Sequence, residues 1–183
     1  MHTKEATELQ TLVLESARHV LPACGLAIGE LGEPPAEGED TKQVVAFMGF
    51  TGDVLRGTLA LVAPLELLRA AYPLPLDPAD KRWQLEVFDW AGEIANRLLG
   101  RIKLALTARG ADVEASTPRV MLGEHLHVTR STKGTVCTAS FLTGASAVRV
   151  WFDAVAAEGR DLFTVPAEAA AETPPEGDVL LFD

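Results

Sequence analysis

The chain has 183 residues, of which 48% are hydrophobic, and its 16 basic against 26 acidic side chains give a formal net charge of −10 at pH 7. This length fits one domain that buries most of its apolar surface. The negative charge argues against nucleic acid and anionic membranes as partners, since both attract basic patches. The sequence contains no apolar run long enough to span a bilayer and no signal-peptide pattern, so we expect a cytoplasmic protein. Cys24 and Cys137 lie far apart and are expected to be buried free thiols.

The N-terminal segment predicts a helix followed by a loop. Apolar residues recur at helical spacing over Glu5–Leu21, and Pro22 is expected to end this helix. Gly29–Thr41 is acidic and rich in Gly and Pro, which predicts an exposed loop.

A hairpin and a short helix are predicted next. Gln43–Phe50 and Val54–Val62 are predicted strands joined by a tight turn. Gly57, in the second strand, is expected to let a helix approach closely. Pro64–Ala71 predicts a short helix that begins at its proline, and Tyr72–Asp80, with its prolines, predicts a rigid linker.

The longest predicted element is a helix over Trp83–Arg109, which contains no proline. Asp80 is its candidate N-cap. Apolar residues form two neighbouring rows at helical spacing, which predicts an amphipathic helix docked on a core. The rows consist of Leu85, Val87, Phe88, Ala91, Gly92, Ile94, Ala95, Leu98, Leu99, Ile102, Ala105 and Leu106.

The opposite side of this helix carries an unusual polar stripe. Asp89, Glu93, Asn96 and Gly100 follow one another at four-, three- and four-residue steps, so they share one face. Glycine costs about 1 kcal/mol relative to alanine inside a helix. Gly100 would let another molecule approach the helix closely. The alternative is that Asn96 is a tolerated surface residue and Gly100 lies under a packed loop.

After Gly110 the pattern changes to short strands. The predicted strands are Asp112–Ser116, Arg119–Met121, Glu124–Thr129, Thr135–Phe141 and Ala145–Phe152. Together these elements predict an α/β fold of the α+β type, in which a long amphipathic helix and shorter helices pack on an antiparallel sheet. We expect one domain over residues 1–156 and a flexible tail, rich in Pro, Ala and Glu, over 157–183.

A histidine pair is the one pattern that suggests a metal. His125 and His127 would lie side by side on a strand, as metal ligands do. No third ligand is evident, and polar residues that alternate on an exposed strand need no metal. We therefore predict no metal site.

The polar stripe also carries a family resemblance. Asp89, Glu93, Ile94, Ala95 and Asn96, followed by Pro118, resemble the signature of the CheC/CheX/FliY chemotaxis phosphatases, and GEIANRLLGRIK (Gly92–Lys103) is most similar to CheX. FMGFTGDVLRGTLALVAP (Phe47–Pro64) and STPRVMLGEHLHV (Ser116–Val128) resemble the family's hairpin and its entry into the later strands. The resemblance covers Leu9–Phe152. One difference is Arg101, because CheX relatives often carry Asn after the glycine.

The resemblance implies a CheX-like phosphatase that dephosphorylates the phospho-aspartate of a CheY-like response regulator. Asn96 would position the attacking water and Glu93 would pair with a lysine of the regulator. Asp89, Arg97 and Gly100 would contact the partner. The regulator would supply Mg²⁺, so no metal or cofactor of the chain's own is expected.

The resemblance also implies a homodimer that pairs through sheet edges. Two rival functions stay open at this point. One is a non-catalytic CheX-like module for binding or dimerisation in a two-component pathway, and the other is an unrelated α/β ligand-binding domain.

Overall fold

The computed structural model describes residues 3–33, 41–77, 79–80, 82–124, 126, 128, 134–158 and 162–163. The predicted combination of helices and an antiparallel sheet is confirmed. The helices are α1 (Thr3–Ala23), α2 (Leu65–Ala71) and α3 (Trp83–Thr107). The strands are β1 (Lys42–Thr51), β2 (Leu55–Pro64), β3 (Glu114–Ala115), β4 (Arg119–Glu124), β5 (Thr135–Thr143) and β6 (Ser146–Ala156).

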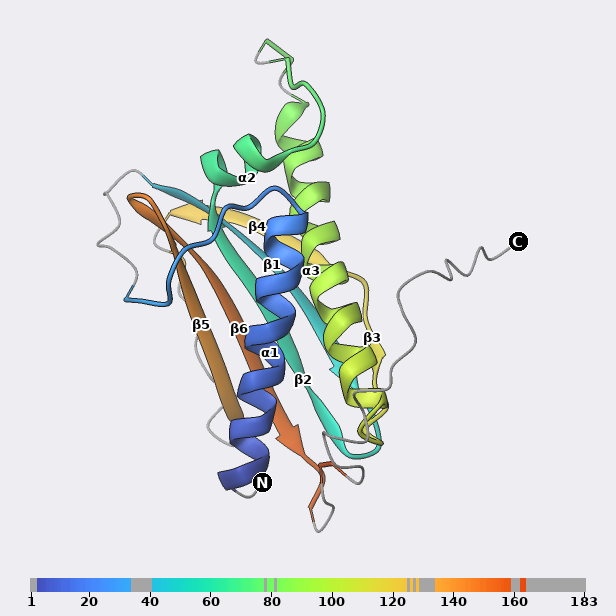
Figure 1. Ribbon diagram of the computed structural model, residues 1–183. Helices are drawn as coiled ribbons and strands as arrows, with labels where there is room; N and C mark the ends of the chain where they lie inside the picture. Colours follow the sequence, from blue (N-terminus) through green and yellow to red (C-terminus); the bar gives the residue numbers. More distant parts are fainter. Residues whose placement is uncertain are drawn as a thin grey trace.

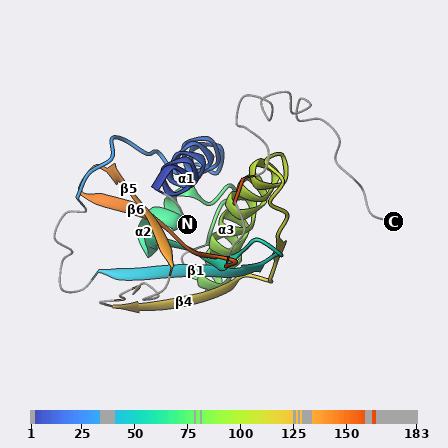
Figure 2. The same cartoon turned by 90° about the horizontal axis from the view of Figure 1, so that it is seen from below.

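The strands form one antiparallel sheet in the order β3-β1-β2-β6-β5, and β4 also pairs with β1. Helices α1 and α3 lie side by side on one face of this sheet, with α2 near one end (Figures 1 and 2). Side chains alternate between the two faces of each strand. In β6 the buried positions Val148, Val150, Phe152 and Ala154 therefore point toward the helices.

The apolar rows of α3 form most of its contact with the core. Val87, Ile94 and Leu98 are completely buried, as predicted. Leu85 is 60% exposed, so its assignment to the buried face is wrong. It lies eleven residues before Asn96, which is about three helical turns, and this places it on the outward side of the helix.

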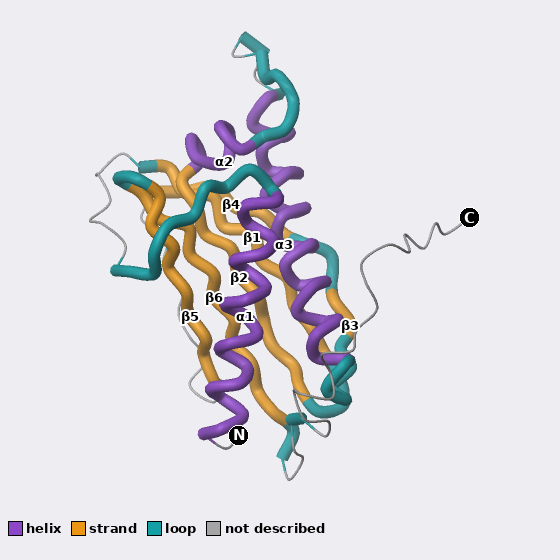
Figure 3. Tube along the Cα trace, in the orientation of Figure 1, coloured by secondary structure: helices purple, strands orange, loops and turns teal. Residues whose placement is uncertain are grey.

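A broken edge strand covers the outer side of β1 (Figure 3). β3 pairs with Phe50 and Thr51, and β4 pairs with residues 42–47. Between them the Ser116 N–H donates to the Gly49 carbonyl at 2.9 Å, while the Ser116 Oγ, and not its backbone carbonyl, accepts the hydrogen bond donated by the Gly49 backbone N–H at 2.9 Å. The break brings Pro118 toward α3.

The opposite edge, β5, is paired by a segment that was predicted to be loop. The Gly29 N–H donates to the Leu142 carbonyl at 2.7 Å, and the Gly32 N–H donates to the Ser140 carbonyl at 3.1 Å. Leu31 forms an isolated bridge with Phe141. The predicted loop is confirmed as exposed at Gly29, Glu30 and Leu31, and no named strand includes it, but its backbone groups also bind the edge of β5. Residues 34–40 lie outside the described part.

Two local predictions about backbone contacts are wrong. Gly57 makes room for the Phe50 ring and for the backbone of β6, not for a helix, since a Cβ there would lie 2.7 Å from Phe50 Cζ. Asp80 precedes the N-cap of α3, which is Arg82. The Asp80 carboxylate accepts from the Arg82 N–H at 2.9 Å, so it stabilises the turn before the helix.

The core continues beyond the predicted domain boundary. Leu162 is fully buried, and its N–H donates to Glu5 Oε1 at 2.7 Å. The Arg109 guanidinium lies 5.7 Å from the centre of the Phe163 ring. The tail prediction concerns residues 157–183, most of which lie outside the described part, so it stays a prediction.

The predicted strand Glu124–Thr129 is not found in the described residues: β4 ends at Glu124, and Leu126 and Val128 belong to no strand. Both histidines of the candidate metal pair, His125 and His127, lie outside the described residues. Among the helices that are described, none has the length and apolarity needed to cross a membrane.

Candidate functional site

The outward face of α3 brings together all the residues predicted for the site. Asp89, Asn96 and Gly100 are exposed, and the Glu93 and Arg97 side chains are 43% and 50% exposed. These residues of α3 face outward because the opposite arc of the helix is apolar and packs on α1, β1 and β4. The predicted polar stripe is therefore a real surface of the molecule.

Glu93 and Arg97 form an ion pair within this surface. Arg97 Nε lies 2.6 Å from Glu93 Oε1, the geometry of a charge-assisted hydrogen bond. This bond raises the pKa of Arg97 above its usual value. The Arg97 guanidinium also lies 5.5 Å from the centre of the Trp90 ring. Arg97 therefore holds the Glu93 carboxylate in one orientation.

The end of α1 contributes to this arrangement. Cys24, buried at the end of α1, has its thiol pKa raised by burial, and the nearby Arg97 guanidinium partly offsets that effect. Arg97 thus lies between Glu93 and the end of a second helix. Its predicted role in binding a partner stays a prediction, because the structure shows its guanidinium engaged within the chain.

Asn96 and Gly100 present an open polar surface. The described part of the chain gives the Asn96 side chain no hydrogen bond, so both ends of its amide are available to another molecule. A Cβ added to Gly100 would meet no described atom within 4 Å. The alternative that Gly100 lies under a packed loop is therefore wrong for the described residues.

Pro118 lies against the helix beside this surface. A Cβ built on Gly92 would be 3.4 Å from Pro118 Cγ and 3.6 Å from Val120 Cγ2. Gly92 lies about one turn before Asn96, so the entry into β4 borders the site on this side. The strand break at Ser116 thus explains how the proline of the sequence motif reaches the helix.

Aromatic residues beside the ion pair were missed by the sequence reasoning. The Tyr72 and Trp90 rings meet edge to face with centroids 6.3 Å apart. The Tyr72 hydroxyl donates to Glu86 Oε2 at 2.9 Å, and this hydrogen bond raises the pKa of Tyr72. The available signal was a second helical row, at three- and four-residue steps, through Glu86, Trp90, Glu93 and Arg97.

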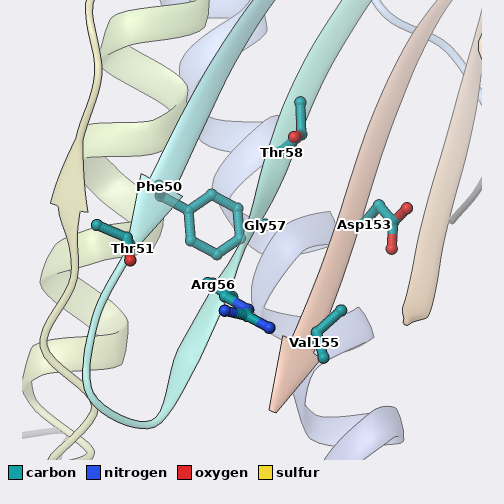
Figure 4. A pocket seen from close by; sticks show the side chains of 7 residues that line it. All are labelled: Phe50, Thr51, Arg56, Gly57, Thr58, Asp153 and Val155. Carbon is teal, nitrogen blue, oxygen red and sulfur yellow. The ribbon is translucent and has the colours of Figure 1, made fainter. Parts of the chain in front are cut away.

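The described residues offer two other kinds of site to consider. They contain no group of three or more His, Cys, Asp or Glu side chains arranged to hold a metal ion. An open cavity of about 400 Å³ lies on the sheet face opposite the helices (Figure 4). It is lined by Phe50, Thr51, Arg56, Gly57, Thr58, Asp153 and Val155. None of these belongs to the polar stripe of α3, so the two surfaces are separate.

Solved structures of similar fold are chemotaxis proteins. CheX from Vibrio vulnificus is 24% identical with a TM-score of 0.63, over 80% of this chain and 96% of that chain. A CheC-like superfamily protein from Shewanella sp. PV-4 is 20% identical with a TM-score of 0.65, over 84% and 99%. The CheX–CheY–BeF₃–Mg²⁺ complex from Borrelia burgdorferi contains a chain that is 18% identical with a TM-score of 0.63, over 79% and 96%. These likenesses establish the fold.

A comparison with curated proteins gave no match. The family model described as chemotaxis phosphatase CheX matches residues 44–142, which run from β1 to β5 and include α3 with its polar stripe. This match spans more than half of the chain, and the fold outside it agrees with the solved structures. The chain therefore belongs to the CheX family of chemotaxis phosphatases.

Proposed function

We propose that this protein hydrolyses the phospho-aspartate of a CheY-like response regulator, with Asn96 positioning the attacking water. The observation that carries the proposal is the exposed amide of Asn96, which makes no hydrogen bond with the described residues and lies one turn from a carboxylate, Glu93, that Arg97 holds in place. Membership of the CheX family supports the reaction. The Borrelia burgdorferi relative, which is described in complex with CheY, BeF₃ and Mg²⁺, supports the class of partner.

The reaction needs little more than an aligned water. The water oxygen attacks phosphorus as the bond from phosphorus to the aspartyl oxygen breaks, which releases inorganic phosphate and a free carboxylate. The Asn96 amide oxygen accepts a hydrogen bond from this water. Because the amide is neutral, it avoids the repulsion that a carboxylate would have with the phosphoryl oxygens. Such positioning is worth roughly a hundredfold or more in rate.

Glu93 sets the register of the complex. Its Oε1 atom is bound to Arg97, which leaves Oε2 to accept from a lysine of the regulator. The acidic Asp89, one turn earlier on the helix, adds to the attraction for that lysine. The regulator supplies both this lysine and the Mg²⁺ at its phosphorylation site.

The test measures the decay of a phosphorylated regulator, beside a binding titration against its beryllofluoride form. Asn96→Ala should abolish the acceleration while binding survives. Asn96→Asp, which keeps the shape but adds a charge, should be equally inactive. Glu93→Ala should both weaken binding and slow turnover. Gln10→Ala, which removes an exposed amide on α1, is the matched control and should behave as the wild type.

The folded state should tolerate these changes, because exposed substitutions usually alter stability by no more than about 0.5 kcal/mol. Acceleration by Asn96→Ala at the wild-type rate would overturn the catalytic role of Asn96. A wild-type protein that binds the regulator but leaves its decay unchanged would favour the non-catalytic binding module.

A further inference from the structure

Two large apolar side chains lie exposed on the same helix as the proposed site. Leu85 is 60% exposed and Leu104 is 64% exposed. Leu85 lies eleven residues before Asn96, and Leu104 lies eleven residues after Glu93. Eleven residues make about three turns, or about 16 Å along the axis, so each leucine shares a helical row with a site residue. The site therefore has one apolar side chain at either end.

The charge along this face changes sign at the site. The N-terminal half of α3 carries the acids Glu86, Asp89 and Glu93. The C-terminal half carries the bases Arg97, Arg101 and Lys103. Asn96 lies at the boundary between the two halves. A partner on this face would thus meet an acidic end with one leucine and a basic end with the other.

The core of this domain does not need either leucine. The buried arc of α3 is complete without them, since Val87, Ile94, Leu98 and Leu106 have no exposed surface. Single exposed leucines are common on soluble proteins and call for no explanation. What needs explanation here is the placement of the two leucines. Leu85 lies three turns before Asn96 and Leu104 lies three turns after Glu93, and the surface between them includes the open Gly100.

We propose that Leu85 and Leu104 are the apolar anchors by which α3 docks on the response regulator. This inference rests on the proposed function and extends it from the reacting residues to the docking surface. Buried apolar anchors supply affinity, while complementary charge selects the orientation. The partner that fits presents a lysine to the half with Asp89 and Glu93, and an acidic surface to Lys103 in the other half, where Arg97 is already paired with Glu93.

The experiment separates binding from chemistry. Leu85→Gln and Leu104→Gln should each raise KM for the phosphorylated regulator, and Kd for its beryllofluoride form, by about tenfold, equal to about 1.4 kcal/mol. Turnover at saturation should stay at the wild-type value, since the anchors bind ground state and transition state equally. Leu74→Gln is the matched control, because Leu74 is also 64% exposed but lies in the linker before α3.

The orientation is tested by charge. Lys103→Glu should raise KM at low salt, and the effect should shrink as ionic strength increases and screens the interaction. A KM that stays at the wild-type value at low salt would overturn the assigned orientation.

The outcomes distinguish this inference from the function on which it rests. Loss of acceleration in Asn96→Ala, together with wild-type KM in both leucine variants, would overturn the docking surface and leave the catalytic proposal standing. A wild type that accelerates nothing would overturn the proposed function itself. The predicted tail ends in an apolar cluster, Val179–Phe182. A fall in KM for the leucine variants, shared by Phe182→Gln, would assign this face of α3 to that cluster. Dissociation of a dimer by the leucine variants with unchanged KM would assign it to a second copy.

Discussion

Replacing Gly100 by alanine tests whether this glycine lowers the stability of α3 while allowing close approach of a partner. Gly100 lies in the interior of α3, and a Cβ there would meet no described atom within 4 Å. The substitution therefore introduces no clash within the described residues. Alanine also loses less backbone entropy than glycine when the chain folds into a helix, so the folded variant should be more stable than the wild type by about 1 kcal/mol. For a protein of this size, the melting temperature should rise by roughly 2–4 °C.

The same methyl group should impair the complex. It projects from the face on which the regulator is proposed to dock, four residues beyond Asn96. A displacement of about 1 Å at a reacting centre can cost about a hundredfold in rate. We therefore expect Gly100→Ala to be more stable than the wild type but slower by about tenfold or more at limiting regulator concentration.

Gly110→Ala is the matched control, ten residues along the same chain. Gly110 has a φ of 83°, in the left-handed region where an alanine is strained by about 1–2 kcal/mol. This variant should melt at a lower temperature and keep wild-type dephosphorylation below that temperature. A fall in melting temperature for Gly100→Ala would contradict the open space beside Gly100. A rise with unchanged kinetics would refute close approach of the regulator.

The remaining predictions concern the thiols, the tail and the oligomeric state. Burial raises the pKa of Cys24 and raises that of Cys137 to about 11, so little thiolate forms near pH 7. Both thiols should resist a thiol reagent near pH 7 until guanidinium unfolds the chain, and fast labelling of the native protein would contradict this. Deletion of Pro166–Asp183 should leave phosphatase activity intact, and lost activity with a preserved fold would give the tail a role. Light scattering should show a homodimer, and a mass of 19.5 kDa would refute it.

Elements that depend on local pattern could be predicted from the sequence. The long run without proline and the two apolar rows placed α3 to within two residues of its observed end. The hairpin of β1 and β2 followed from alternation and a tight turn. Each of these signals is contained in one stretch of chain, so no distant contact is needed to interpret it.

Features that depend on distant partners could not be predicted in this way. Residues 29–32 have a loop composition and belong to no named strand, but an isolated bridge and backbone hydrogen bonds join them to the edge of β5. Gly57 suggested a close helix, but the near neighbours are Phe50 and the backbone of β6. Leu85 belongs to an apolar row by spacing alone, whereas the packing of α3 leaves it outside the core.

The role of Arg97 shows the same limit at the site itself. Its four-residue distance from Glu93 allows an ion pair, but the resemblance placed it among residues that contact the partner. In the structure the Trp90 ring and the buried end of α1 hold its guanidinium against Glu93. Under the proposed function, Arg97 would therefore act on the partner through Glu93, whose carboxylate it orients. On the proposed docking surface, the fixed acid and the change of charge along α3 would then select the orientation of the regulator, while the leucines at the two ends of the stripe would supply affinity.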